Sequence, residues 1–130
     1  MSEEVHSGMV LYVKDVDRIS VFYSTVLELQ MADRDDEHVV LESQTLQLVV
    51  LRVPRDMAST ITIAVPPVRR AMAAIKPVFV VSSIARVRVA AEACGGVMNA
   101  PDQEWSFRGF TVCDGLDPEG NVIQFREKAG

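Results

Sequence analysis

The most constraining feature of this sequence is a pattern of strand, helix, strand and strand that occurs twice. In the first half, the apolar run at 9–14 predicts a strand, and apolar residues at helical spacing after the N-cap Asp15 predict a helix. Further strands are predicted at 38–42 and 46–53, with a short extra strand near Met31. One helix among several strands is typical of an α+β unit.

The second half repeats this order. Strands are predicted at 78–81, 110–114 and 121–127, and a helix is predicted between the N-cap Ser83 and the stop signal Gly95-Gly96. Because one supersecondary unit recurs, we expect two modules that pack to share a core.

The two halves align at the level of single residues. An offset of 68 places Val10 on Val78, and an offset of 75 places Val49 on Gln124. The difference means that the second half holds seven more residues before its last strand. The repeat rests on matched pattern and order, because sequence identity between the halves is weak.

Residues 54–77 separate the halves and contain four prolines, so they cannot form one regular element. One interpretation is a crossover that docks Ile61, Ile63 and Val65 on the body of the protein. The other is a functional segment that covers a surface, which is common for connections of this length.

Composition limits the partners. The net charge of −5 disfavours nucleic acid, which needs a basic face, and Arg69-Arg70 is interpreted as a solvated pair. No apolar run is long enough to span a membrane, and the polar start of the chain is unlike a signal peptide, so a cytoplasmic location is expected. Cys94 and Cys113 have no metal-type or redox spacing and are expected to be reduced packing residues.

Two segments carry a family resemblance. The stretch VKDVDRISVFYSTVLEL near the start and DGLDPEGNVIQF near the end closely resemble the vicinal oxygen chelate superfamily, which includes glyoxalase I, bleomycin-resistance proteins and extradiol dioxygenases. The resemblance covers nearly the whole chain. It implies a single glyoxalase-like domain over 1–130, with module one at about 6–53, a linker at about 54–75 and module two at about 76–128.

The resemblance also implies an α+β fold of two βαβββ modules in tandem, whose mixed sheets curl into a cup. In metal-dependent members a divalent ion lies in the cup, bound by His, Glu or Gln at four strand positions. Those positions fall here on Gly8, Val49, Lys76 and Gln124. Two have no donor and one is a cation, so no metal cofactor is expected, although a divalent metal stays the alternative.

Several polar residues receive an interpretation of their own. His6 could share the strand face of Gly8, yet one imidazole and one amide are too few ligands for a metal, and His38 is interpreted as structural or exposed. The three acids near the last hairpin are interpreted as turn residues: Asp114, Asp117 and Glu119.

If the cup is present, its lining is mostly apolar and suits a small organic molecule with an anionic or carbonyl end, held by Lys76 and Gln124. The other interpretation places Lys76 in solvent and bonds Gln124 to nearby backbone. The segment 104–110 is interpreted as an aromatic loop that lids a pocket, packs on the body or forms a dimer seam. The candidate ligand-binding residues are Lys76, Gln124, Tyr12, Val49, Trp105 and Arg126.

Three functions remain open, and no catalytic residue is assigned. The first is a metal-free, glyoxalase/bleomycin-resistance-like protein that binds a small molecule, with a homodimer implied by the resemblance. The second is a metal-dependent lyase or dioxygenase of the glyoxalase I or extradiol type. The third is a dimeric interaction module without an open pocket. Whether the chain is an enzyme is left undecided by the sequence.

Overall fold

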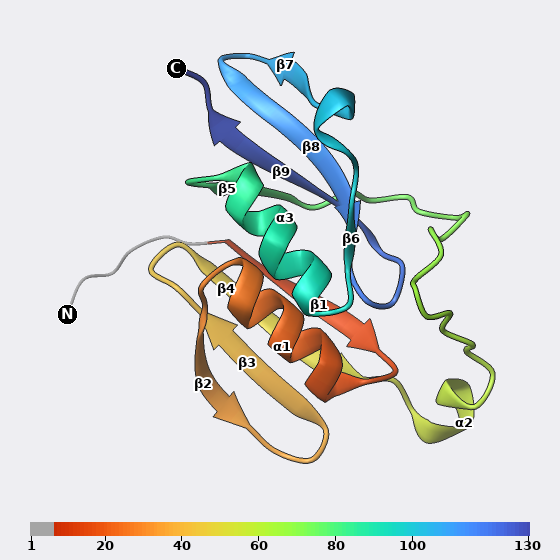
Figure 1. Cartoon of the computed structure of the whole chain (residues 1–130). Helices are drawn as coiled ribbons and strands as arrows, with labels where there is room; N and C mark the ends of the chain where they lie inside the picture. Colours follow the sequence, from red (N-terminus) through yellow and green to blue (C-terminus); the bar gives the residue numbers. More distant parts are fainter. Residues whose placement is uncertain (1–6) are drawn as a thin grey trace. The chain divides into compact units, whose positions relative to one another are not determined.

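The computed structural model describes residues 7–130 of the chain. The chain divides into two compact units, the first ending at Thr62 and the second running from Ile63 to Gly130 (Figure 1). None of the helices in residues 7–130 is long and apolar enough to cross a membrane.

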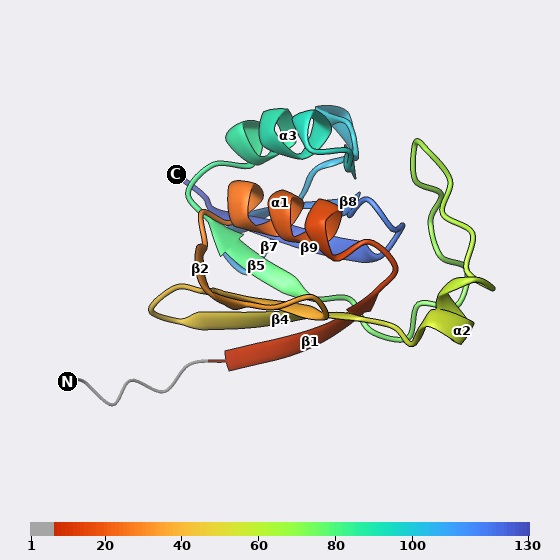
Figure 2. The ribbon, with the colours of Figure 1, turned by 90° about the horizontal axis from the view of Figure 1, so that it is seen from below.

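The first unit contains a mixed sheet and a helix that lies on one of its faces (Figure 2). Its strands run in the order β1-β4-β3-β2, with β1 parallel to β4 and the other neighbours antiparallel. The elements are β1 Ser7–Val13, α1 Val16–Val26, β2 Gln30–Arg34, β3 His38–Glu42, β4 Leu46–Arg52 and the short α2 Arg55–Ala58.

The core of the first unit lies between α1 and the sheet. Asp15 caps the helix as predicted, because its side chain accepts a hydrogen bond from the Arg18 backbone N–H at 3.1 Å. Ile19 and Phe22 of α1 and Leu48 of β4 are fully buried. Burying each such side chain contributes roughly 1.5–3 kcal/mol, so this face of α1 holds the unit together.

The second unit has the same topology. Its strands run in the order β5-β9-β8-β6, with β5 parallel to β9, and β7 adds a further pairing with β8. The elements are β5 Val78–Val81, α3 Ile84–Ala93, β6 Val97–Met98, the 3₁₀ helix η1 Pro101–Gln103, β7 Trp105–Phe107, β8 Phe110–Leu116 and β9 Val122–Lys128. The predicted α+β class with mixed sheets is confirmed.

The core of the second unit lies between α3 and its sheet. Phe79 and Phe125 are neighbours across β5 and β9, with ring centroids 6.0 Å apart. Cys113 pairs with Phe125, and its Sγ lies 3.5 Å from Nη2 of Arg88 on α3. Burial raises the pKa of the Cys113 thiol, which favours the neutral form and fits the predicted packing role.

The register of the sheets confirms the repeat. Val10 pairs with Val49 across β1 and β4, and Val78 pairs with Gln124 across β5 and β9. These are the pairs that the offsets of 68 and 75 superimpose on each other. The two sheets therefore carry equivalent residues at the positions where the sequence alignment places them.

Two predictions about the last hairpins need correction. The segment 104–110 is not a loop, because Trp105–Phe107 forms strand β7, and Arg108 and Gly109 adopt the left-handed backbone of a tight hairpin turn. Strand β8 extends to Leu116, so Asp114 lies in a strand and not in a turn.

Most of the connection 54–77 is irregular, as predicted, with only the single turn of α2. Val65 in this connection is 73% exposed and does not dock. Ile61 and Ile63 are half-buried. Arg70 is not a purely solvated residue, because its Nε donates to the Glu119 carbonyl at 3.1 Å.

Candidate functional site

The candidate site lies on the face of the second sheet opposite α3, called the distal face below. Strand pairing places Val78, Gln124 and Asp114 in one row of this face. The next row holds Val80 and Arg126. Because paired residues of neighbouring strands point to the same side of a sheet, the polar side chains of these rows meet over an otherwise apolar surface.

Gln124 is the centre of a polar network. Its side chain is almost fully buried, at 5% exposure. Its Nε2 donates to Oδ1 of Asp114 at 3.1 Å, and its Oε1 accepts from Nε of Arg126 at 2.8 Å. Both ends of the amide are therefore engaged by side chains, and neither bonds backbone. A neutral amide suits this position because it bonds an acid on one side and a cation on the other.

Asp114 belongs to this network and was missed by sequence reasoning. Its Oδ2 pairs with Nζ of Lys76 at 2.9 Å, while Oδ1 accepts from Gln124. The side chain of Asp114 is only 17% exposed, and that of Lys76 is 41% exposed. The signal that could have found Asp114 is its place directly opposite Gln124, which depends on knowing the hairpin register.

Arg126 links the network to the β7 hairpin. Its guanidinium carbon lies 4.9 Å from the centroid of the Phe107 ring, a cation–π contact. Trp105 pairs with Val112, which in turn pairs with Arg126, so Trp105 lies on the same face two strands away. Three of the predicted ligand-binding residues thus lie on one sheet, namely Gln124, Arg126 and Trp105, and Lys76, which precedes β5, joins them by pairing with Asp114.

The other two predicted residues belong to the first unit. Tyr12 on β1 and Val49 on β4 lie on the face of the first sheet opposite α1, where Tyr12 is 67% exposed and Val49 is half-buried. Val10 and Leu51 lie on this same face, which is called the distal face of the first sheet. The central row of this face is therefore apolar, whereas Gln47, Glu42 and His38 lie in the rows on either side of it.

The residues at the family's metal positions do not fit a metal ion. Gly8 and Val49 carry no donor, Lys76 pairs with Asp114, and the oxygen of Gln124 already accepts from Arg126. Within residues 7–130, no group of three His, Cys, Asp or Glu side chains is arranged to hold a metal ion. His6, the remaining candidate, lies outside the described residues.

His38 is engaged within its own hairpin. Its Nδ1 lies 2.9 Å from Oδ1 of Asp35, and its Nε2 lies 3.3 Å from Oδ2 of Asp33. This agrees with the predicted structural role.

The turn before β9 positions Gln124. Oδ1 of Asp117 accepts from the backbone N–H of Glu119 at 2.9 Å and of Asn121 at 3.0 Å. Gly120 has a φ of +83°, and a Cβ there would lie 2.2 Å from the Val68 carbonyl oxygen. The predicted turn role of Asp117 is confirmed, and this turn sets the register of β9.

The comparison with protein families decides the assignment. The family model described as "Glyoxalase-like domain" matches residues 8–125, which include Lys76, Asp114 and Gln124 of the polar network, and Arg126 follows directly after. The chain belongs to the glyoxalase-like domain family. The resemblance to the vicinal oxygen chelate superfamily is thereby confirmed. None of the curated proteins matches this glyoxalase-like chain.

Solved structures agree on the glyoxalase-like fold. A glyoxalase/bleomycin resistance protein/dioxygenase family enzyme from Burkholderia phytofirmans PsJN has a TM-score of 0.71 at 15% identity, over 96% of this chain and 99% of that one. TioX from Micromonospora sp. ML1 has a TM-score of 0.66 at 19% identity, over 96% of this chain and 99% of that one. The bleomycin resistance determinant encoded on transposon Tn5 has a TM-score of 0.64 at 16% identity, over 96% of this chain and 98% of that one. At these identities the likeness establishes the fold alone.

Proposed function

We propose that this glyoxalase-like protein binds a small organic anion without a metal ion, on the distal face of the second sheet. The observation that carries the proposal is the network in which Asp114 and Gln124 hold two cations, Lys76 and Arg126, over that face. The chemistry is binding, and no bond-making step is assigned to it.

The charge of the network favours an anion. Lys76 and Arg126 contribute two positive charges and Asp114 contributes one negative charge, so this cluster is cationic in a protein of net charge −5. Gln124 takes one Arg126 N–H, and the guanidinium has further donors that can bind a carboxylate. Gln124 and Asp114 therefore act as positioning residues for the two cations.

The surface around the cations favours an apolar or aromatic ligand body. Val78 is 42% exposed, Trp105 41%, and Phe107 44%. An aromatic side chain beside a guanidinium can stack on a planar ligand while the cation binds its charged end. We therefore expect a small aromatic or branched carboxylate to bind better than a compact polar anion such as inorganic phosphate.

The test is isothermal titration of the full chain with a panel of aromatic and aliphatic carboxylates, beside inorganic phosphate. Lys76→Gln and Arg126→Gln should each weaken binding about tenfold, the effect of losing one charge-assisted hydrogen bond. Arg69→Gln, the same kind of change at an exposed arginine of the same unit, is the matched control and should leave affinity unchanged. Equal affinity in all variants would remove the proposal.

Elemental analysis of the purified protein tests the metal-free part. We expect no stoichiometric metal, because the four family positions lack a ligand set. About one zinc, nickel or iron per chain, with turnover that a chelator abolishes and metal restores, would instead establish a lyase or dioxygenase. The homodimer and the cytoplasmic location stay predictions, and light scattering on a sizing column tests the homodimer.

A further inference from the structure

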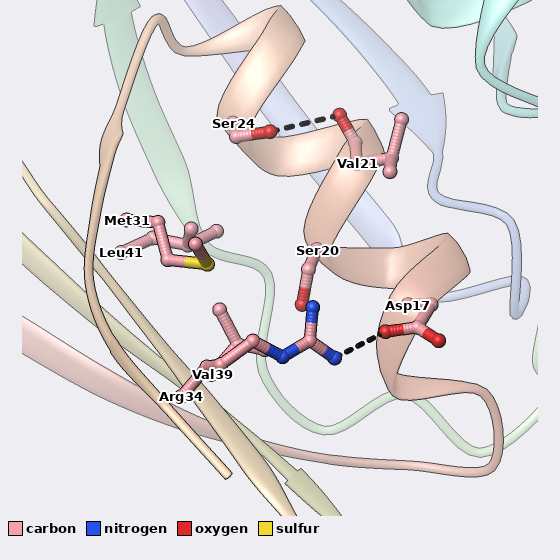
Figure 3. Close-up of a pocket in the computed structure, with 8 residues that line it drawn as sticks. All are labelled: Asp17, Ser20, Val21, Ser24, Met31, Arg34, Val39 and Leu41. Atoms are coloured by element: carbon pink, nitrogen blue, oxygen red, sulfur yellow. Dashed lines mark hydrogen bonds and ion pairs between the residues drawn. The ribbon is translucent and has the colours of Figure 1, made fainter. Parts of the chain in front are cut away.

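A separate pocket lies within the first unit, between α1, the edge strand β2 and its neighbour β3 (Figure 3). Its volume is about 320 Å³, at the small end of the roughly 300–1,000 Å³ typical of ligand pockets. It opens on the α1 side of the first sheet, whereas Val49 and Tyr12 lie on the distal face. The pocket is therefore distinct from every candidate position considered above.

The pocket exists because α1 does not cover β2. Every residue of β2 is exposed, and the register of β2 shifts between Met31 and Asp33. Met31 pairs with Leu41, which is fully buried, and yet Met31 is 60% exposed on the same side of the sheet. An apolar wall of Met31, Leu41 and Val39 thus faces a gap beside the helix.

The helix side of the pocket carries three polar residues beside Val21. Asp17, Ser20 and Ser24 recur at three- and four-residue spacing, so they form a stripe on the face of α1 toward β2. Such a stripe is uncommon beside an apolar wall, because helix faces toward a sheet are usually apolar.

Ser20 carries the strongest sign of a ligand. Ser20 is only 8% exposed, and its Oγ has no hydrogen-bond partner within residues 7–130. Buried hydroxyl groups are nearly always hydrogen-bonded, because desolvating one without a partner is unfavourable. Ser24 on the same stripe differs, since its Oγ donates to the Val21 carbonyl at 3.2 Å.

Arg34 supplies a cation beside this hydroxyl. Its Nη2 pairs with Oδ1 of Asp17 at 2.5 Å, which places the guanidinium beside α1. Figure 3 shows the Ser20 hydroxyl pointing toward that guanidinium, with Met31 and Leu41 at the other end of the pocket. The pocket therefore has two hydrogen-bond donors at one end and an apolar wall at the other.

We propose that this pocket binds a small monocarboxylate with an apolar tail. The carboxylate accepts from the Ser20 hydroxyl and from guanidinium N–H groups of Arg34 that do not face Asp17. The tail lies on Met31, Val39 and Leu41.

The experiment is a titration of the full-length protein with hexanoate, followed by amide chemical shifts. We expect saturable shifts within 17–24 and 31–41, and weaker binding of hexanamide, which has the same tail without the charge. Ser20→Ala and Arg34→Gln should each weaken hexanoate binding about tenfold. Thr25→Ala is the matched control, because Thr25 is an exposed residue of α1 outside the pocket, and the affinity of this variant for hexanoate should stay that of the unmodified chain.

Arg126→Gln separates this pocket from the second-unit site, since it should leave the hexanoate shifts at 17–24 unchanged. Shifts confined to 76–128, equal binding of hexanamide, or no shifts with hexanoate at about 10 mM would each overturn the proposal. A loss of binding in Thr25→Ala as large as in Ser20→Ala would do the same, because the loss of the Ser20 hydroxyl would then have no specific effect.

Discussion

The two units share a backbone plan but differ in what their distal faces carry. In the first unit, the central row of that face is Val10, Val49 and Val40. In the second unit, the equivalent row is Val78, Gln124 and Asp114. The same strand order therefore supports an apolar row in one sheet and a hydrogen-bonded polar row in the other. Topology sets the positions, and the side chains at those positions set the chemistry.

The largest expected effect tests the cores of the two units at equivalent positions. Phe125→Ala should lower the free energy of unfolding by about 3–5 kcal/mol, because it leaves a large cavity beside Phe79. Val50 is fully buried at the equivalent position of the first unit. Val50→Ala removes fewer atoms, so it should lower the free energy of unfolding by less than Phe125→Ala does. Urea denaturation measures both, and a larger loss for Val50→Ala would show that the positions are not equivalent.

The second prediction concerns the turns that precede the last strand of each unit. The first unit uses Ser43, whose Oγ accepts from the Leu46 backbone, whereas the second uses Asp117 and the left-handed Gly120. Gly120→Ala should cost about 2–4 kcal/mol, since about 1–2 kcal/mol of backbone strain adds to a clash with the Val68 carbonyl.

Gly109→Ala is the control for Gly120→Ala. Gly109 has the same φ of +83°, but nothing lies within 4 Å of an added Cβ. Thermal unfolding should therefore show only the strain of about 1–2 kcal/mol for this variant. Equal losses in the two variants would mean that contact with Val68 contributes nothing.

The third prediction concerns variants that exchange the central residues of the two distal rows, Gln124 in the second unit and Val49 in the first. Gln124→Val should lower the free energy of unfolding by about 1–3 kcal/mol, because Asp114 and Arg126 each lose a hydrogen-bond partner. The reverse change, Val49→Gln, places an amide on a half-buried position of the first unit and should change stability by about 0.5 kcal/mol or less. Chemical denaturation of both variants decides whether the polar row is specific to the second unit.

The fourth prediction concerns the pocket of the first unit. Ser20→Ala should raise the free energy of unfolding by about 1 kcal/mol relative to Ser24→Ala, because it removes a buried hydroxyl without a partner. Both variants replace a serine of α1 by alanine, so the gain in helix propensity is the same in each. The difference between their free energies of unfolding therefore reports the effect of the hydroxyl. A Ser20 variant less stable than the Ser24 variant would show that the hydroxyl is satisfied in solution.

The smallest expected effect is a pH dependence in the β2–β3 hairpin. The pKa of Asp35 is lowered from its ordinary value of 3.8. The main cause is the hydrogen bond from the Glu37 backbone N–H. Desolvation opposes the shift in part, and the hydrogen bonds and charge of His38 add to it. A lowered folded-state pKa stabilises the native state above the unfolded-state value, and this contribution is lost as the pH falls through the folded-state pKa.

Asp35→Asn should therefore flatten the stability profile between about pH 5 and pH 3, measured by urea denaturation. Asp36→Asn, a neighbouring exposed change, is the control and should leave the profile as it is. A profile that is equally steep in Asp35→Asn would show that the hairpin contacts of Asp35 do not contribute.

Much of the fold could be predicted because it depends on local signals. Asp15 and Ser83 cap helices in the positions that their sequence context indicates. Trp105–Phe107 could not be assigned as a strand, because three residues of mixed character become regular only by pairing with β8. The candidate site was only partly predictable: the family resemblance placed Lys76 and Gln124, and strand alternation placed Arg126, whereas Asp114 required knowledge of which residue lies opposite Gln124.

The sequence by itself determined the repeat, the two modules, and the lack of a ligand set at the family's metal positions. The repeat follows from residue type and spacing along the chain, which need no long-range contact, whereas the metal positions are those that the family resemblance implies. Only the tertiary structure decided that Gln124 bonds Asp114 and Arg126, and that Ser20 is buried without a partner. Both depend on contacts between distant or adjacent elements, because hydrogen bonding and burial are properties of packed surroundings and not of a residue alone.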